Sequence, residues 1–70
     1  MKNLTEADRL REEYLELCEK LLEHAKDMRN YGMKPGNAWL ARSELAKIVG
    51  LTGDLESLVD EIKRADQAGL

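Results

Sequence analysis

The stretch from Thr5 to Tyr31 constrains the fold of this chain more than any other feature. It contains no proline or glycine, and its apolar residues recur at the spacing of one helical face. At about 100° per residue the apolar arc is roughly 160° wide, broader than the ~100° stripe of an ordinary surface helix. We therefore predict one amphipathic helix over residues 5–31 that needs a partner on each flank. One edge of its arc is formed by Leu10, Tyr14, Leu17, Leu21 and Met28.

The length of this helix predicts self-association. At ~1.5 Å per residue it spans about 40 Å, more than the width of a compact domain of this size. A chain of 70 residues also has a marginal core, so a further stabilising device is expected. Cys18 is the only cysteine and His24 the only histidine, which argues against a disulfide or a zinc site. We therefore expect a homodimer, formed through the five residues of that edge.

The remainder of the chain predicts two shorter helices. Residues 32–37 contain two glycines and the only proline, which predicts a loop. Asn37 then offers an N-cap for a helix over residues 38–49, which Gly50 would end. Apolar residues recur at helical spacing again over residues 54–68, and no stretch alternates as a strand would. The predicted fold is a single all-α domain of 70 residues: a long N-terminal helix plus a two-helix C-terminal hairpin. The inward stripe expected for the middle helix is Ala41, Leu45, Ile48 and Val49.

Residues 43–52 resemble the first helix and turn of a helix-turn-helix. In that family an alanine lies where the two helices cross, and a glycine four residues later makes the turn, as Ala46 and Gly50 would here. The apolar positions that also match are Val49, Leu51 and Val59. The resemblance covers a short part of the chain, and it implies a DNA-binding transcriptional regulator as an alternative function.

The charges of the predicted third helix disfavour nucleic acid as a partner. The family's other inward position in its second helix falls on Glu56, and Lys63 and Arg64 come only near the end of the helix. Phosphate and base recognition depend largely on Arg and Lys. The chain has a net charge of −3 and an isoelectric point near 5.1. Its longest apolar runs fall well short of the roughly 18 residues of a membrane span, so no membrane partner is expected.

No group of residues indicates catalysis. His24 has no second ligand or base at a persuasive spacing, and Cys18 has acidic sequence neighbours that would not activate a thiolate. No glycine-rich loop follows a strand, so nucleotide binding has no support. We expect no enzyme activity, no cofactor and no metal ligand. The lone cysteine and the absence of a signal-like apolar segment near the N-terminus predict a cytoplasmic protein.

Large side chains flank the predicted loop, and two interpretations of them remain open. They either seal the end of a small core or form a recognition patch, since Trp and Tyr dominate binding hot spots. The candidate patch is Tyr31, Met33, Trp39 and Arg42. The function that fits best is a small regulator or inhibitor, of the kind a phage or other mobile element carries. It would bind an unidentified protein and act sterically. A structural or assembly subunit is a further alternative.

Overall fold

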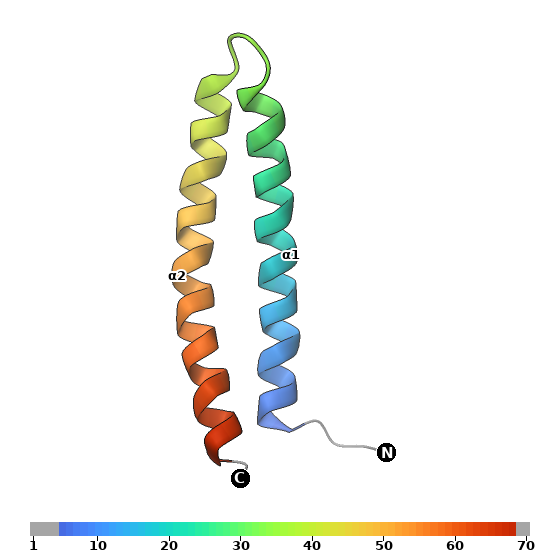
Figure 1. The fold of residues 1–70 in the computed structure, drawn as a ribbon, viewed down its shortest axis with the longest axis vertical. Coiled ribbons are helices and arrows are strands. Elements are labelled where there is room, and N and C mark those ends of the chain that lie inside the picture. Colours follow the sequence, from blue (N-terminus) through green and yellow to red (C-terminus); the bar gives the residue numbers. More distant parts are fainter. Residues whose placement is uncertain (1–4, 69–70) are drawn as a thin grey trace.

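The protein is a hairpin of two long helices. A computed structural model describes residues 5–68, in which α1 (Glu6–Gly32) and α2 (Ala38–Ala68) are joined by residues 33–37. The helices run antiparallel and side by side (Figure 1). We call the end with the turn the tip, and the end where α1 begins and α2 ends the base. The described residues contain no strand, so the all-α prediction is confirmed. Neither helix is long and apolar enough to cross a membrane.

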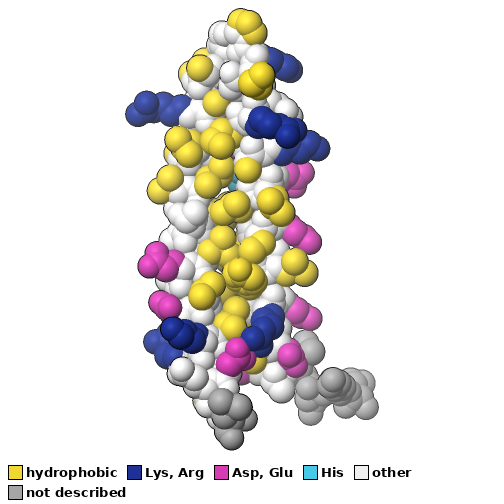
Figure 2. Space-filling model, viewed as in Figure 1, with side chains coloured by type: hydrophobic (Ala, Val, Ile, Leu, Met, Phe, Trp, Pro, Cys, Tyr) yellow, Lys and Arg dark blue, Asp and Glu magenta, His cyan; other side chains and the backbone are white. Residues whose placement is uncertain are grey.

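The hairpin is a rod only one helix layer thick. Its Cα atoms extend over 52 × 25 × 11 Å, with a radius of gyration of 16.1 Å, whereas a compact domain of 70 residues has a radius of gyration of about 11 Å. Most domains bury their apolar surfaces between two packed layers. Here apolar side chains line one broad side of the rod, over both helices (Figure 2). A single layer therefore leaves that side without cover from the described part of the chain.

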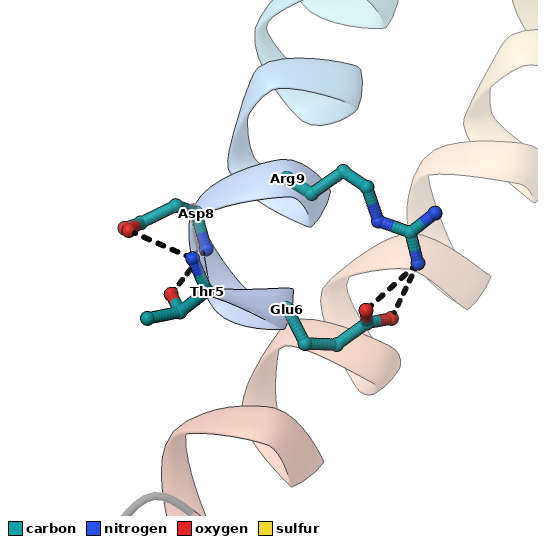
Figure 3. A network of polar contacts seen from close by, with 4 residues as sticks. All are labelled: Thr5, Glu6, Asp8 and Arg9. Atoms are coloured by element: carbon teal, nitrogen blue, oxygen red, sulfur yellow. Dashed lines mark hydrogen bonds and ion pairs between the residues drawn. The ribbon is translucent and has the colours of Figure 1, made fainter. Parts of the chain in front are cut away.

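The N-terminus of α1 is closed by a capping box. Thr5 Oγ1 accepts a hydrogen bond from the Asp8 backbone N–H at 3.1 Å, and the Thr5 N–H donates to Asp8 Oδ2 at 3.4 Å (Figure 3). These bonds satisfy donors that a helix end otherwise leaves unpaired. Glu6 and Arg9 form an exposed ion pair beside the cap, 2.8 Å apart. The predicted start of this helix is confirmed, and its end lies one residue beyond the predicted Tyr31.

The C-terminal half differs from its prediction. The two helices expected over residues 38–49 and 54–68 are one helix, α2, which begins at Ala38 as predicted but continues through residues 50–53. Neither Gly50 nor Gly53 has a positive φ, and Thr52 Oγ1 donates within the helix to the Val49 carbonyl at 2.7 Å. The prediction of a break at Gly50 was wrong, and the turn that the helix-turn-helix resemblance implied is not formed.

Packing along α1 explains why α2 does not break. Each glycine inside a helix costs about 1 kcal/mol relative to alanine. A continuous helix, however, places Leu51 and Leu55 on the same side of α2 as Ile48 and Leu58, facing α1. Burying a leucine side chain contributes about 1.5–3 kcal/mol. The apolar contacts on both sides of residues 50–53 therefore outweigh the local preference of glycine for a turn.

The contact between the helices, which we call the seam, follows the heptad spacing of a coiled coil. Side chains at alternating intervals of three and four residues are buried or half-buried along both helices, except that Tyr14 is 38% exposed. The α1 positions are Ala7, Leu10, Tyr14, Leu17, Leu21, His24, Met28 and Tyr31. The α2 positions are Ala41, Glu44, Ile48, Leu51, Leu55, Leu58, Ile62 and Ala65. The core of the protein is therefore this single line of layers, in which Leu10 and Leu58 are each 6% exposed.

The tip turn brings the two helices into close contact. Gly36 has a φ of 84°, in the left-handed region that favours glycine. The Asn37 carbonyl accepts from the backbone N–H groups of Leu40 and Ala41, which starts α2. A Cβ added at Gly32 would lie 3.8 Å from the Ala41 Cβ, so the helices approach closely where they leave the turn.

Candidate interaction surfaces

The edge of α1 that we predicted to face a second copy faces α2 instead. Its members Leu10, Tyr14, Leu17, Leu21 and Met28 all occupy seam positions. Leu10 is buried, whereas Tyr14, at 38%, is the most exposed side chain of the five. The opposite edge of the same arc is open to solvent, since Leu15 is 58% and Leu22 is 65% exposed. α2 therefore takes the edge that was assigned to the dimer, and the second contact that the width of the arc predicts stays a prediction.

Heptad geometry places the exposed apolar residues of both helices on one side of the rod. A residue directly after a seam position is rotated by about 100° from it. Because the helices are antiparallel, this rotation turns α1 and α2 side chains toward the same side. Figure 2 shows apolar atoms running along both helices on that side. We define the apolar face as Tyr14, Leu15, Cys18, Leu22, Leu45, Val49 and Val59.

Shallow grooves run along this face. One groove is lined by Tyr14 of α1 and by side chains of α2, so both helices contribute to its surface. The α2 residues are Thr52, Leu55, Glu56, Val59 and Asp60. A second groove nearer the tip is lined by Arg42, Leu45, Ala46 and Val49 of α2. Contiguous exposed apolar surface of this kind marks interaction sites on soluble proteins.

The other side of the rod is polar. Residues directly before a seam position face it, and nearly all of them are charged or hydroxylated. A groove on that side is lined by Glu13, Asp54, Ser57 and Glu61 together with the seam residues Leu17 and Leu58. The carboxylates keep this surface hydrated, so the two sides of one thin rod have opposite character.

One polar pair interrupts the seam. His24 Nδ1 lies 2.6 Å from Glu44 Oε2, and Lys47 Nζ lies 3.2 Å from Glu44 Oε1. The His24 imidazole and the Lys47 ammonium hold the pKa of the Glu44 carboxyl below its usual range. Since both partners occupy core positions of a heptad repeat, the pair favours one alignment of the helices, as single polar core pairs do in coiled coils.

A second cross-helix contact lies at the base. The Arg11 guanidinium donates to both carboxylate oxygens of Asp66, at 3.0 and 2.6 Å, and holds the pKa of that carboxyl below its usual range. Both side chains are about half exposed, so solvent screens the pair and its contribution to stability is small. It closes the end of the rod that lies opposite the turn.

The predicted recognition patch is largely exposed and lies at the tip. Met33 is 80% exposed and Trp39 is 69% exposed, while Tyr31 is partly covered in the last layer of the seam. Arg42 is exposed one helical turn after Trp39 and also lines the groove beside Leu45. Of the two interpretations, sealing the core therefore applies to Tyr31, whereas Met33 and Trp39 project into solvent.

Sequence reasoning missed the α2 half of the apolar face. Leu45 and Val49 were expected to face inward, yet they are 48% and 63% exposed. It also missed Glu44, which is 8% exposed and pairs with the only histidine. The signal that would have found both was present: the three-and-four spacing from Ala41 onward passes through Glu44 and skips Leu45 and Val49.

The described residues contain no cluster of three or more side chains suited to hold a metal ion. Comparison of the chain with models of protein families, with curated proteins and with solved structures found no match.

Proposed function

We propose that this chain is a non-catalytic protein-binding module that regulates or inhibits a partner by occupying part of its surface. The observation that carries this proposal is the exposure of Met33 and Trp39 at the tip. Large side chains of this kind supply most of the energy in protein interfaces. In this proposal the apolar tip binds a pocket of the partner, and the rigid rod then lies against the partner and blocks part of its surface.

The module has two kinds of partner in this proposal. The tip patch of Tyr31, Met33, Trp39 and Arg42 binds a protein whose identity we leave open, and the apolar face binds a second copy of the chain. The compartment that we propose is the cytoplasm, because Cys18 is a free thiol and reducing conditions preserve it. We do not propose the DNA-binding alternative, because it relied on a turn at Gly50 and α2 is continuous there.

Affinity capture with matched tip variants tests the proposal. The tagged chain would be incubated with an extract of the cells that encode it, and bound proteins would be identified by mass spectrometry. We expect Trp39→Ala to weaken capture of a specific protein by roughly 30-fold or more, the effect of losing a hot-spot residue worth at least about 2 kcal/mol. Met33→Ala should weaken it less.

The control is Ser57→Asp, which changes the polar side far from the tip and should capture as the unmodified chain does. Trp39 is the only tryptophan, so its fluorescence should shift to shorter wavelength when the purified partner covers it. Equal capture by Trp39→Ala and Ser57→Asp would contradict the role of the tip. Failure of the unmodified chain to capture any specific protein would contradict the function itself.

A further inference from the structure

We propose that a second copy of this chain covers the apolar face in the antiparallel sense, giving a four-helix bundle with the two turns at opposite ends. This inference deepens the self-association included in the proposed function. It shares Arg42 with the tip patch but does not depend on Met33 or Trp39. Three features of the structure lead to it: the surface left exposed, the position of the apolar residues along the rod, and the distribution of charge.

The chain exposes more surface than a compact protein of its mass, and the difference is large enough for a dimer interface. A compact 8.0 kDa protein exposes about 4,450 Å², whereas this chain exposes 5715 Å². The surplus of roughly 1,300 Å² exceeds the ~800 Å² that each partner contributes to a standard interface. A second layer of two helices supplies the cover that other domains build from their own chain.

The apolar residues are centred on the middle of the rod. On α1, Leu15 and Leu22 stand on either side of Cys18. The His24–Glu44 contact shows which residues of the two helices lie at the same level along the rod. Six residues closer to the base than this contact, Cys18 of α1 and Gly50 of α2 therefore lie at one level. The exposed apolar residues of α2 lie on both sides of that level, with Val49 nearer the tip and Val59 nearer the base. A twofold axis at this level therefore superposes the apolar region of one copy on that of the other.

Charge selects the antiparallel sense. Basic side chains flank the face toward the tip, while acidic ones flank it from the middle toward the base, among a few basic groups at the base itself (Figure 2). The tip group is Lys26, Arg29 and Arg42, and the acidic group is Glu12, Glu19, Glu56 and Asp60. The basic groups at the base are Lys63 and Arg11, and Arg11 is already paired with Asp66 of its own chain. With the turns at opposite ends, the tip group of each copy meets the acidic group of the other. With both turns at the same end, like charges would meet at each end, which disfavours that arrangement.

Particular pairs follow from the position of the axis. A rotation about the level of Cys18 and Gly50 brings Arg42 of one copy between Glu56 and Asp60 of the other. The same rotation brings Lys26 close to Glu12. Leu15 of each copy packs against Leu22 of the other, and the two Cys18 side chains face each other near the axis, where their small size permits close approach of the helices.

Sedimentation equilibrium at micromolar concentrations tests the interface. We expect the unmodified chain to have twice the mass of one chain. Leu22→Asp should be a folded monomer, with a dissociation constant raised at least about 100-fold, because it places a carboxylate in the apolar contact. Leu22 is exposed in the hairpin, so the variant should keep its helical circular dichroism. The matched control Ser57→Asp adds the same charge to the polar side and should remain a dimer.

Charge substitutions test the orientation. In the antiparallel dimer Arg42→Glu removes an attraction to Glu56 and Asp60, so it should raise the dissociation constant severalfold, and the double variant Arg42→Glu with Glu56→Arg should restore much of the affinity. With both turns at the same end, Arg42→Glu would relieve repulsion and strengthen the dimer. A short bismaleimide should also join the two Cys18 thiols of the unmodified dimer.

Each alternative outcome overturns a defined part of the inference. A monomeric unmodified chain, or a Leu22→Asp variant that remains dimeric, removes the apolar face as the interface. Growth into larger assemblies with concentration favours an assembly subunit in place of a closed dimer. A stronger dimer for Arg42→Glu reverses the orientation. Since none of these variants alters Met33 or Trp39, failure of the dimer leaves the capture experiment at the tip as a separate test of the proposed function.

Discussion

The seam and the apolar face are two apolar surfaces of one hairpin, yet among residues 5–68 only the seam is covered. Seam residues recur at intervals of three and four from Ala7 to Tyr31 and from Ala41 to Ala65. The apolar face follows no such continuous spacing, and charged side chains such as Arg29 and Arg42 replace apolar ones toward its ends. Unbroken heptad spacing therefore identifies the surface that is paired within the hairpin, whereas the total width of an apolar arc does not.

The largest expected effect separates the seam from the face. Leu58→Ala leaves a gap in the most buried layer and should lower the free energy of unfolding by about 2–5 kcal/mol, a large fraction of the stability of a small domain. Leu22→Ala, at a dilution where the chain is monomeric, should change it by about 0.5 kcal/mol or less. Urea denaturation followed by circular dichroism measures both. Equal losses would show that the two surfaces are not distinct in the monomer.

A smaller effect tests whether α2 is one rod carrying both surfaces. Gly50→Ala and Gly53→Ala should each raise the free energy of unfolding by up to ~1 kcal/mol, because alanine favours a helix and an added Cβ meets nothing within 4 Å. The control is Gly36→Ala, which should lower it by roughly 1 kcal/mol because φ is positive there. Destabilisation by Gly50→Ala would instead support the turn that the sequence suggested.

The smallest effect concerns the polar layer of the seam. The folded hairpin holds the pKa of Glu44 below that of an unfolded glutamate, about 4.3. As pH falls, the unfolded chain therefore takes up a proton first, and the stabilisation that is complete above this pH is lost toward the lower folded pKa. Thermal melts would be recorded from about pH 6, which is above this range, down through it. The melting temperature of Glu44→Gln should fall less steeply with decreasing pH than that of the unmodified chain. An unchanged profile would contradict the contact.

The exposed Arg11–Asp66 pair can be compared with the Glu44 contact in the same experiment. Arg11 lowers the pKa of Asp66 in the same direction, so Asp66→Asn should also flatten the acid limb of the profile. Because this pair is exposed and screened, added salt should reduce its contribution more than that of the Glu44 contact. If added salt reduced the contributions of Glu44 and Asp66 equally, the seam would not protect the Glu44 contact from solvent screening.

The sequence predicted α1 well because its local and long-range signals agree. Thr5 caps it, no breaker interrupts it, and its apolar spacing matches its partner. In α2 the two kinds of signal conflict, since the pair of glycines favours a turn while Leu51 and Leu55 continue the seam. The place of Met33 and Trp39 beside the turn was predictable because glycines and the only proline mark the loop. Their exposure was not, because the sequence left open whether they seal the core. The α2 half of the apolar face was not, because placing Leu45 and Val49 required knowing that the helix is continuous.

The position of Trp39 at one end of a 52 Å rod has a consequence for stoichiometry. In the antiparallel pair that we propose, the two tips would point away from each other, so one dimer would present two identical contacts to separate target molecules. Such a dimer would be bivalent: it would bridge two targets or bind a symmetric target with a gain in avidity, and only while the two copies stay together. Dilution would then weaken inhibition more steeply than the affinity of either tip alone requires.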